Sequence, residues 1–263
     1  MSLSLIALLA SLGALGGFTS GLLGFGGGVV MFPLLLYVPS LLGFQAMHAK
    51  TVAAVVVTQV FFSASVAGMA HFRSGRVHRQ LTLIAGTTSA GSAFLGGMAS
   101  QWVSDRFLLI LFGVVTLSVS AIMLMRAPSL IQDETPDSRI AFPVLPLSLF
   151  AIITGGFAGL LGSGNFIFPP LLIYILKVPT RIAIGSSLVI ALINTSAGFL
   201  GKLVTGQIPF LLTLAAVLGA TLGALAGERV HGRLSSRVLR RIYAGIVALI
   251  ALRVWLTIFA FDQ

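Results

Sequence analysis

The chain has 263 residues, of which 57% are hydrophobic and only 8% are charged, and its mean hydropathy is +1.07. About a quarter of the residues of an ordinary soluble domain are charged, so this composition excludes a soluble globular protein and favours a polytopic membrane protein. The absence of cysteine excludes disulfides, cysteine metal ligands and thiol catalysis. The net charge of +10 is attributed to basic loops that orient helices in a lipid bilayer, not to a nucleic-acid partner.

Ten apolar segments follow one another along the chain, five in each half. The first has no basic residues before it, which favours a membrane segment over a cleaved signal peptide. The second and the seventh are shorter than the ~17–20 residues that a spanning helix needs, and both contain prolines. They are therefore short oblique spans or re-entrant half-helices, which gives eight to ten membrane segments. The segments are 3–23, 29–42, 49–70, 81–102, 107–125, 140–161, 166–176, 182–203, 210–226 and 238–261.

One polar stretch, RAPSLIQDETPDSR at 126–139, separates the two halves. The later parts of the halves correspond, because SGRV at 74–77 resembles TGQI at 205–208. The sequence thus predicts an all-α membrane domain over 1–263, with a first repeat at 1–126, a linker at 127–139 and a second repeat at 140–263.

A glycine-rich element opens each half and directly precedes each short segment. It reads GGFTSGLLGFGGGVVMFPLLLY at 16–37 and GGFAGLLGSGNFIFPPLLIY at 155–174. Duplicated, Gly/Pro-broken apolar segments indicate a transporter site at a repeat interface, and the free N–H groups of the following helices favour an anion. The alternative is that the glycines only allow close helix packing. The candidate ligands in the breaks are Gly26, Gly27, Gly28, Ser163, Gly164 and Asn165.

The distribution of basic residues predicts the topology. If each half crosses the membrane an odd number of times, the repeats are inverted, and most basic residues then share the side of Arg73, Arg76 and Arg79, which the positive-inside rule places in the cytoplasm. Four crossings per half would remove this bias. The residues that share this side are Arg73, Arg76, Arg79, Arg126, Arg139, Lys177, Arg181, Arg229, Arg233, Arg237, Arg240 and Arg241.

The third segment of each half carries polar residues at membrane depth. Such residues are costly in lipid unless they pair with each other, with water or with a ligand. Substrate binding and interhelical hydrogen bonds are both open to them. The candidates are Gln59, Ser63, Asn194, Thr195 and Ser196.

Basic residues flank these third segments. They could attract an anion toward the site, and the alternative for each is snorkelling or topology. They are His48, Lys50, Arg181 and Lys202, with His71 at the place in the first half that corresponds to Lys202. The six carboxylates all lie in loops or at segment ends, which disfavours a cationic substrate and supports an anion. The histidines show no metal-ligand spacing, so we expect no metal, no cofactor and no enzymatic activity.

Small residues recur every four positions in two segments, at Ala85, Ser89, Ala93 and Gly97 and at Gly219, Gly223 and Gly227. Such faces pack helices tightly, either inside the bundle or in a homodimer.

The duplicated GLLGFGGGVVMFPLLL element and the ten-segment layout resemble the TauE/SafE sulfite exporter family of bacterial membrane proteins, over nearly the whole chain. The resemblance implies export of a small sulfur-containing anion, such as sulfite, sulfoacetate or a related organosulfonate, across the bacterial inner membrane. We therefore expect a secondary transporter with alternating access around a midplane site. An anion channel of the same fold, a membrane enzyme and a non-transporting subunit are the alternatives.

Overall fold

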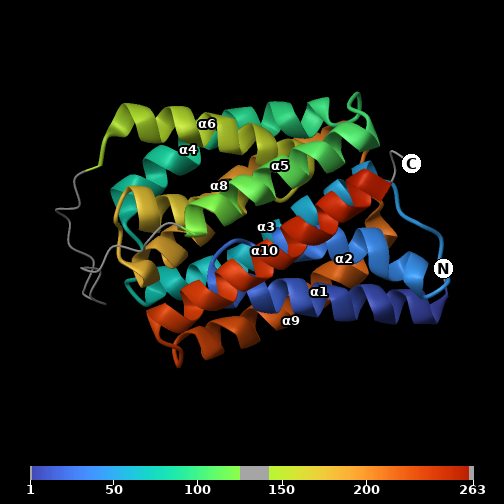
Figure 1. The fold of residues 1–263 in the computed structure, drawn as a ribbon, viewed down its shortest axis with the longest axis horizontal. Coiled ribbons are helices and arrows are strands. Elements are labelled where there is room, and N and C mark those ends of the chain that lie inside the picture. Colours follow the sequence, from blue (N-terminus) through green and yellow to red (C-terminus); the bar gives the residue numbers. More distant parts are fainter. Residues whose placement is uncertain (1, 125–141, 261–263) are drawn as a thin grey trace.

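The computed structural model describes residues 2–124 and 142–260, and all regular secondary structure in this part of the chain is helical (Figure 1). The predicted linker, with Arg126 and Arg139, lies outside the described residues. The long helices are α1 (Leu3–Leu23), α3 (Ala49–Arg73), α4 (Arg79–Ala99), α5 (Asp105–Leu124), α6 (Val144–Leu161), α8 (Thr180–Val204), α9 (Phe210–His231) and α10 (Ser236–Ala260). All of them except α4 are long and apolar enough to cross a membrane. Helix α4 has 21 residues but is rich in Gly, Ser and Thr. These segments form helices because only intra-segment hydrogen bonds can satisfy a backbone in lipid.

The second and seventh predicted segments are short. Helix α2 (Gly28–Leu41) contains Pro33 and Pro39. The corresponding part of the second half is a 3₁₀ turn η1 (Gly164–Ile167), an α turn α7 (Phe168–Pro170) and a π turn η2 (Leu171–Ile175). Figure 1 shows that α2 returns to the end of the molecule where α1 begins. The first two elements of the chain therefore form a hairpin with one short arm.

Left-handed glycines make both breaks. Gly24, with a φ of 81°, caps the C-terminus of α1, and Gly162, with a φ of 71°, caps that of α6. A side chain would be strained in this region of φ. After Gly24 the chain folds back, so that a methyl group on Gly27 would lie 1.8 Å from the carbonyl oxygen of Gly16. Helix α2 therefore begins beside the middle of α1.

The first helix of each half packs against a helix of the other half. Helix α1 packs parallel to α9, because Gly13, Gly17 and Gly21 lie against Ala216, Ala220 and Ala224 in the same order. Helix α6 packs parallel to α4, because Gly155 and Gly159 lie against Ser89 and Ala93. The small-residue faces of α4 and α9 are thus used within the bundle, and the homodimer stays a prediction.

The course of the chain supports the predicted inverted repeats. Figure 1 shows α1 and α6 starting from opposite ends of the molecule. Helices α3 and α8 are antiparallel, since Gly68 lies against Leu188 whereas Val57 lies against Gly198. Opposite courses of the first and third helices of the halves are what inversion requires, although exact repeat symmetry stays a prediction.

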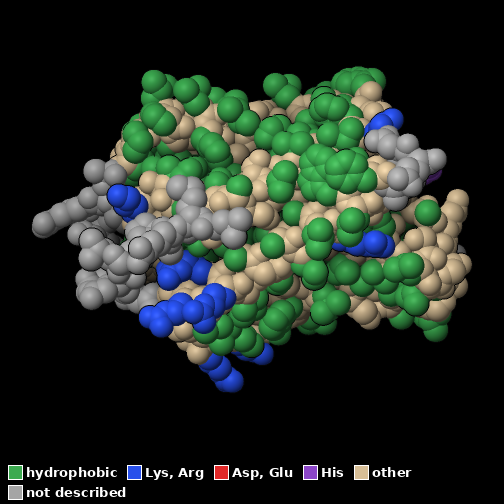
Figure 2. Space-filling view, in the orientation of Figure 1, with side chains coloured by type: hydrophobic (Ala, Val, Ile, Leu, Met, Phe, Trp, Pro, Cys, Tyr) green, Lys and Arg blue, Asp and Glu red, His purple; other side chains and the backbone are tan. Residues whose placement is uncertain are grey.

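One end of the bundle is basic, and we call it the basic end. Figure 2 shows Lys and Arg side chains gathered there, at the left of the view, while hydrophobic side chains cover the flanks. Three contacts tie its loops together. Arg76 lies 3.6 Å from Glu228, Arg181 donates to the carbonyl oxygen of Leu234, and Arg240 donates to the hydroxyl of Thr180. The predicted basic side therefore corresponds to one real end of the molecule, as far as its residues are described.

Candidate functional site

The two breaks meet in the centre of the bundle. A methyl group on Gly28 would lie 2.7 Å from Cβ of Ser163, so the first break touches the second directly. Gly26 is held by α3, because Ser63 Oγ donates to its carbonyl oxygen at 3.2 Å. Gln59, one turn earlier on α3, donates to Ser63 Oγ at 3.3 Å. The structure thus brings together residues from both glycine-rich elements and from the third segment.

The second break makes a matching contact with α8. Asn194 Nδ2 donates to Asn165 Oδ1 at 2.5 Å, and both residues are fully buried. We call Gln59, Ser63, Ser163, Asn165 and Asn194 the central cluster. Each half contributes a polar residue of its third segment, on α3 or α8, that holds the break of its own half.

The central cluster has more hydrogen-bonding capacity than it uses. Four of its buried polar atoms have no hydrogen-bond partner among the described residues: Gln59 Oε1, Ser163 Oγ, Asn165 Nδ2 and Asn194 Oδ1. An unsatisfied buried polar group costs about 1–3 kcal/mol. Such atoms in a native interior call for an explanation, and a ligand that binds between the breaks supplies one.

Two of the predicted polar residues do not share this feature. The hydroxyl of Thr195 donates to the carbonyl oxygen of Ala191, and that of Ser196 donates to Leu192 at 2.6 Å. Both hydroxyls therefore satisfy their own helix. Gly27 and Gly164 are buried in the breaks, where Gly164 lies against the backbone of Ala158.

Lys202 is the most unusual of the predicted basic residues, because it is fully buried. Its ammonium donates to Ser100 Oγ at 2.5 Å and to the carbonyl oxygen of Leu160 at 3.4 Å. Gln207 extends the group, since its Oε1 accepts from Ser100 at 2.6 Å. Among the described residues no carboxylate pairs with Lys202. Leu160 lies in the last turn of α6, so this cation borders the second break.

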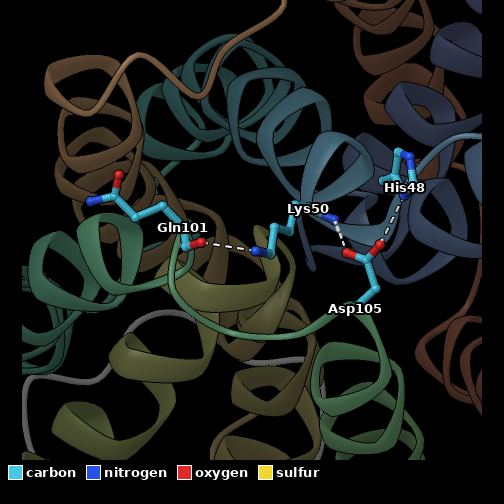
Figure 3. Close-up of polar contacts among 4 residues, drawn as sticks. All are labelled: His48, Lys50, Gln101 and Asp105. Atoms are coloured by element: carbon cyan, nitrogen blue, oxygen red, sulfur yellow. Dashed lines mark hydrogen bonds and ion pairs between the residues drawn. The ribbon is translucent and has the colours of Figure 1, made fainter.

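His48 and Lys50 lie at the start of α3, opposite the basic end where α3 finishes at Arg73. The two residues share the carboxylate of Asp105 (Figure 3). Asp105, the first residue of α5, lies 3.1 Å from His48 Nδ1 and accepts from the backbone N–H of Lys50 at 3.1 Å. The Lys50 ammonium donates to the carbonyl oxygen of Gln101 at 2.8 Å. These contacts join the start of α3 to the start of α5, beside a cavity of about 520 Å³ that His48 and Asp105 help to line.

Arg181 lies at the basic end, where its guanidinium donates to the carbonyl oxygen of Leu234. The four predicted anion-attracting residues are thus divided: Arg181 at one end, His48 and Lys50 at the other, and Lys202 inside. The structure does not bring them into one cluster. The prediction treated Lys202 as a flanking charge, whereas the structure buries it beside the second break.

Sequence reasoning missed the partners of these groups. Ser100 and Gln207 surround Lys202, and His71 meets His231 near the other break with ring centroids 4.7 Å apart. The repeat could have signalled these partners, because the 131-residue shift that aligns SGRV with TGQI, and His71 with Lys202, also aligns Ser100 with His231.

The bundle and its buried polar centre define a polytopic membrane transporter. Its described residues include no group of three His, Asp or Glu side chains that could hold a metal ion. Two broken helices that face each other across a polar centre are the architecture in which secondary transporters bind substrate.

Comparisons with known proteins identify the family. Residues 9–254 match the model of the family described as sulfite exporter TauE/SafE, and the chain belongs to this family. It is 34% identical over 186 residues to a "probable membrane transporter protein" of Xylella fastidiosa strain Temecula1, which covers 70% of this chain and 69% of the relative. It is 20% identical over 227 residues to "probable membrane transporter protein YunE" of Bacillus subtilis strain 168, which covers 81% and 83%. No solved structure matches the chain significantly.

Proposed function

We propose that this protein is a secondary transporter that exports a small sulfur-containing anion, such as sulfite or an organosulfonate, across the bacterial inner membrane. The anion binds at the membrane midplane in the central cluster, and the two halves rock around it to give alternating access. The family supports the substrate class, and the site supports its charge.

The burial of Lys202 is the observation that most strongly supports an anionic substrate. An ammonium removed from water loses several kcal/mol of solvation, which is normally recovered from a carboxylate and further hydrogen bonds. Lys202 has a hydroxyl and a distant carbonyl instead. An anionic substrate that passes between the breaks would supply the missing negative charge.

The central cluster supplies polar groups for recognition. Ser163 Oγ and Asn165 Nδ2 are buried donors without a partner, and both belong to the break that Lys202 borders. The first break, Gly26 to Gly28, offers backbone instead of side chains. The second half would therefore contribute more to recognition of the oxygens of the anion than the first.

The basic end supports one orientation of the protein in the membrane. The positive-inside rule places it in the cytoplasm, so the His48–Asp105 end faces the periplasm. Lys202, on the periplasmic side of the central cluster, then lies on the exit route of an exported anion.

Transport in proteoliposomes tests the proposal. Radiolabelled sulfite and sulfoacetate are loaded inside or outside vesicles that contain the purified protein, and their flux is compared with that of a cation of similar size. We expect flux of at least one of the two anions, and a large loss of that flux in the variants Lys202→Met and Asn165→Ala. Arg237→Met removes an exposed cation and is the matched control. Cation flux without flux of either anion would refute the proposal, and single-channel currents would indicate a channel instead.

A further inference from the structure

A buried histidine pair lies between the central cluster and the basic end. His71 is near the end of α3 and His231 is the last residue of α9, and both are fully buried. Their rings meet edge to face, with centroids 4.7 Å apart. His231 Nδ1 lies 2.8 Å from the carbonyl oxygen of Leu22, so this nitrogen carries a proton and donates it. Neither ring nitrogen of His71 makes a hydrogen bond of good geometry in the described residues, although the ring faces the backbone of Gly21.

The position of the pair connects it to the first break. From Ser63 to His71, helix α3 rises about 12 Å at 1.5 Å per residue. Leu22 is in the last turn of α1, directly before Gly24 opens the break. Any change that alters the bond between His231 and Leu22 therefore acts on the segment that shapes the central cluster.

Lys202 occupies the position in the second half that corresponds to His71, on the opposite side of the central cluster. It lies eight positions after Asn194, as His71 lies eight positions after Ser63. It bonds the carbonyl oxygen of Leu160 in the last turn of α6. Each side of the central cluster thus has a basic side chain that holds the last turn of the helix before a break. The pair at the basic end can take up a proton on His71 while His231 Nδ1 remains bonded to Leu22.

Few charged side chains lie near the histidine pair. The loop between α3 and α4 contributes Arg76, which acts electrostatically on His71 and lies 3.6 Å from Glu228 of α9. Helix α1 has no titratable side chain between Leu3 and Leu23. From the start of α8, Arg181 reaches Leu234 beyond the end of α9. Cations thus outnumber carboxylates around the pair, and an additional positive charge there is unfavourable while the helices are closed.

We propose that the His71–His231 pair binds the coupling proton of the transporter and that its protonation opens the basic end. This inference rests on the proposed transport function. A proton from solution adds to a free ring nitrogen of His71, and the pair becomes an imidazole and an imidazolium. The buried charge is relieved when α1 and α9 separate and admit water.

The linkage has a definite sign. The open state binds the proton more tightly than the closed state, so acidification populates the open state. The response falls below about pH 6.5, the value at which a water-exposed histidine titrates, because protonation must also open the helices. Protonation and opening would occur together, which is how a carrier couples two fluxes.

A cysteine on α1, next to the contact between Leu22 and His231, tests the proposal without a substrate. Ser20 is fully buried on α1, between Gly16, which lies beside Gln59, and Leu22, which bonds His231. Ser20→Cys is labelled in proteoliposomes with a maleimide between about pH 8 and about pH 5, on either side of the titration range of histidine. The rate is divided by that of Ser74→Cys, an exposed position near the basic end, which removes the pH dependence of thiol chemistry.

We expect the labelling ratio to rise about tenfold on acidification, as one proton of different affinity in the two states allows. His71→Gln and His231→Gln, each made in the Ser20→Cys chain, should flatten the profile. His48→Gln, which changes an exposed histidine at the opposite end, should preserve it.

A flat profile with both histidines present would overturn the proposal, whatever the variants do. A rise that persists in both histidine variants would also overturn it. Because no anion is present, the labelling result stands apart from the transport assay, and failure to carry sulfite does not produce a flat profile.

Discussion

Replacing Lys202 by methionine should stabilise the protein and remove its response to the anion. The ammonium is fully buried and has three N–H donors, but it has one short bond, 2.5 Å to Ser100, and one long bond, 3.4 Å to Leu160. Burial of an ion costs several kcal/mol, and a hydrogen bond to a charged group returns about 1.5–3 kcal/mol. We therefore expect a shortfall on the order of 1–3 kcal/mol. Methionine fills a similar volume without charge.

The assay is thermal unfolding of the purified protein in detergent, with and without sulfite. For a chain of this size, about 1 kcal/mol shifts Tm by about 2–4 °C, so Lys202→Met should raise Tm of the empty protein by about 2–12 °C. Sulfite at a hundred times its Kd should stabilise the unaltered protein by about 2.7 kcal/mol. The same addition should leave Lys202→Met unchanged, because the charge that attracts the anion is gone.

Arg237→Met is the control, because Arg237 is exposed on α10. It should keep the sulfite response and change the stability by no more than about 0.5 kcal/mol. If Lys202→Met lowers Tm and sulfite still stabilises the variant, Lys202 is a structural residue, and the argument from its burial is wrong.

Three further predictions follow from the packing and the topology. Gly155→Ala should destabilise the protein by about 1–3 kcal/mol in thermal unfolding, because a methyl group there would lie 2.3 Å from the carbonyl oxygen of Ser89. Its neighbour Gly156 faces open space, so Gly156→Ala is the control. Equal effects of the two substitutions would contradict the packing of α4 on α6. Cysteines at Ser74 and Ser235, both exposed, should react with an impermeant maleimide from the same side of the membrane, whereas labelling from opposite sides would exclude the inverted arrangement. Asn194→Asp should reduce sulfite flux at least tenfold, because a carboxylate beside Asn165 repels the anion; unchanged flux would place the substrate elsewhere.

Much of the fold could be predicted because helix formation in lipid is a local matter. The long helices follow the predicted apolar segments within a few residues, as α1 and α8 show, and the second and seventh segments are short and broken as expected. The irregular geometry of the seventh was not predictable in detail. Whether the segment after Gly162 becomes a 3₁₀, an α or a π turn depends on the neighbours that hold its backbone.

The candidate site was only partly predictable. Glycine breaks and mid-segment amides are visible in the sequence, so Gln59, Asn165 and Asn194 could be proposed without coordinates. Their pairings could not, because each contact joins helices whose crossing is set by packing. Thr195 and Ser196 show the limit, since nothing in their sequence distinguishes a hydroxyl that faces a ligand from one that bonds its own helix.

The sequence by itself determined that the protein lies in a lipid bilayer and where its helices form and break. It also determined that no carboxylate lies in the middle of an apolar segment. These properties depend on composition and on contacts within one turn of helix, which the order of residues specifies directly. Only the tertiary structure decided that Lys202 lies inside against Ser100 and Leu160, and that His71 meets His231. Ser100 and His71 come from the first half of the chain, whereas Lys202 and His231 come from the second. They meet because small residues let α1 pack on α9 and α4 pack on α6.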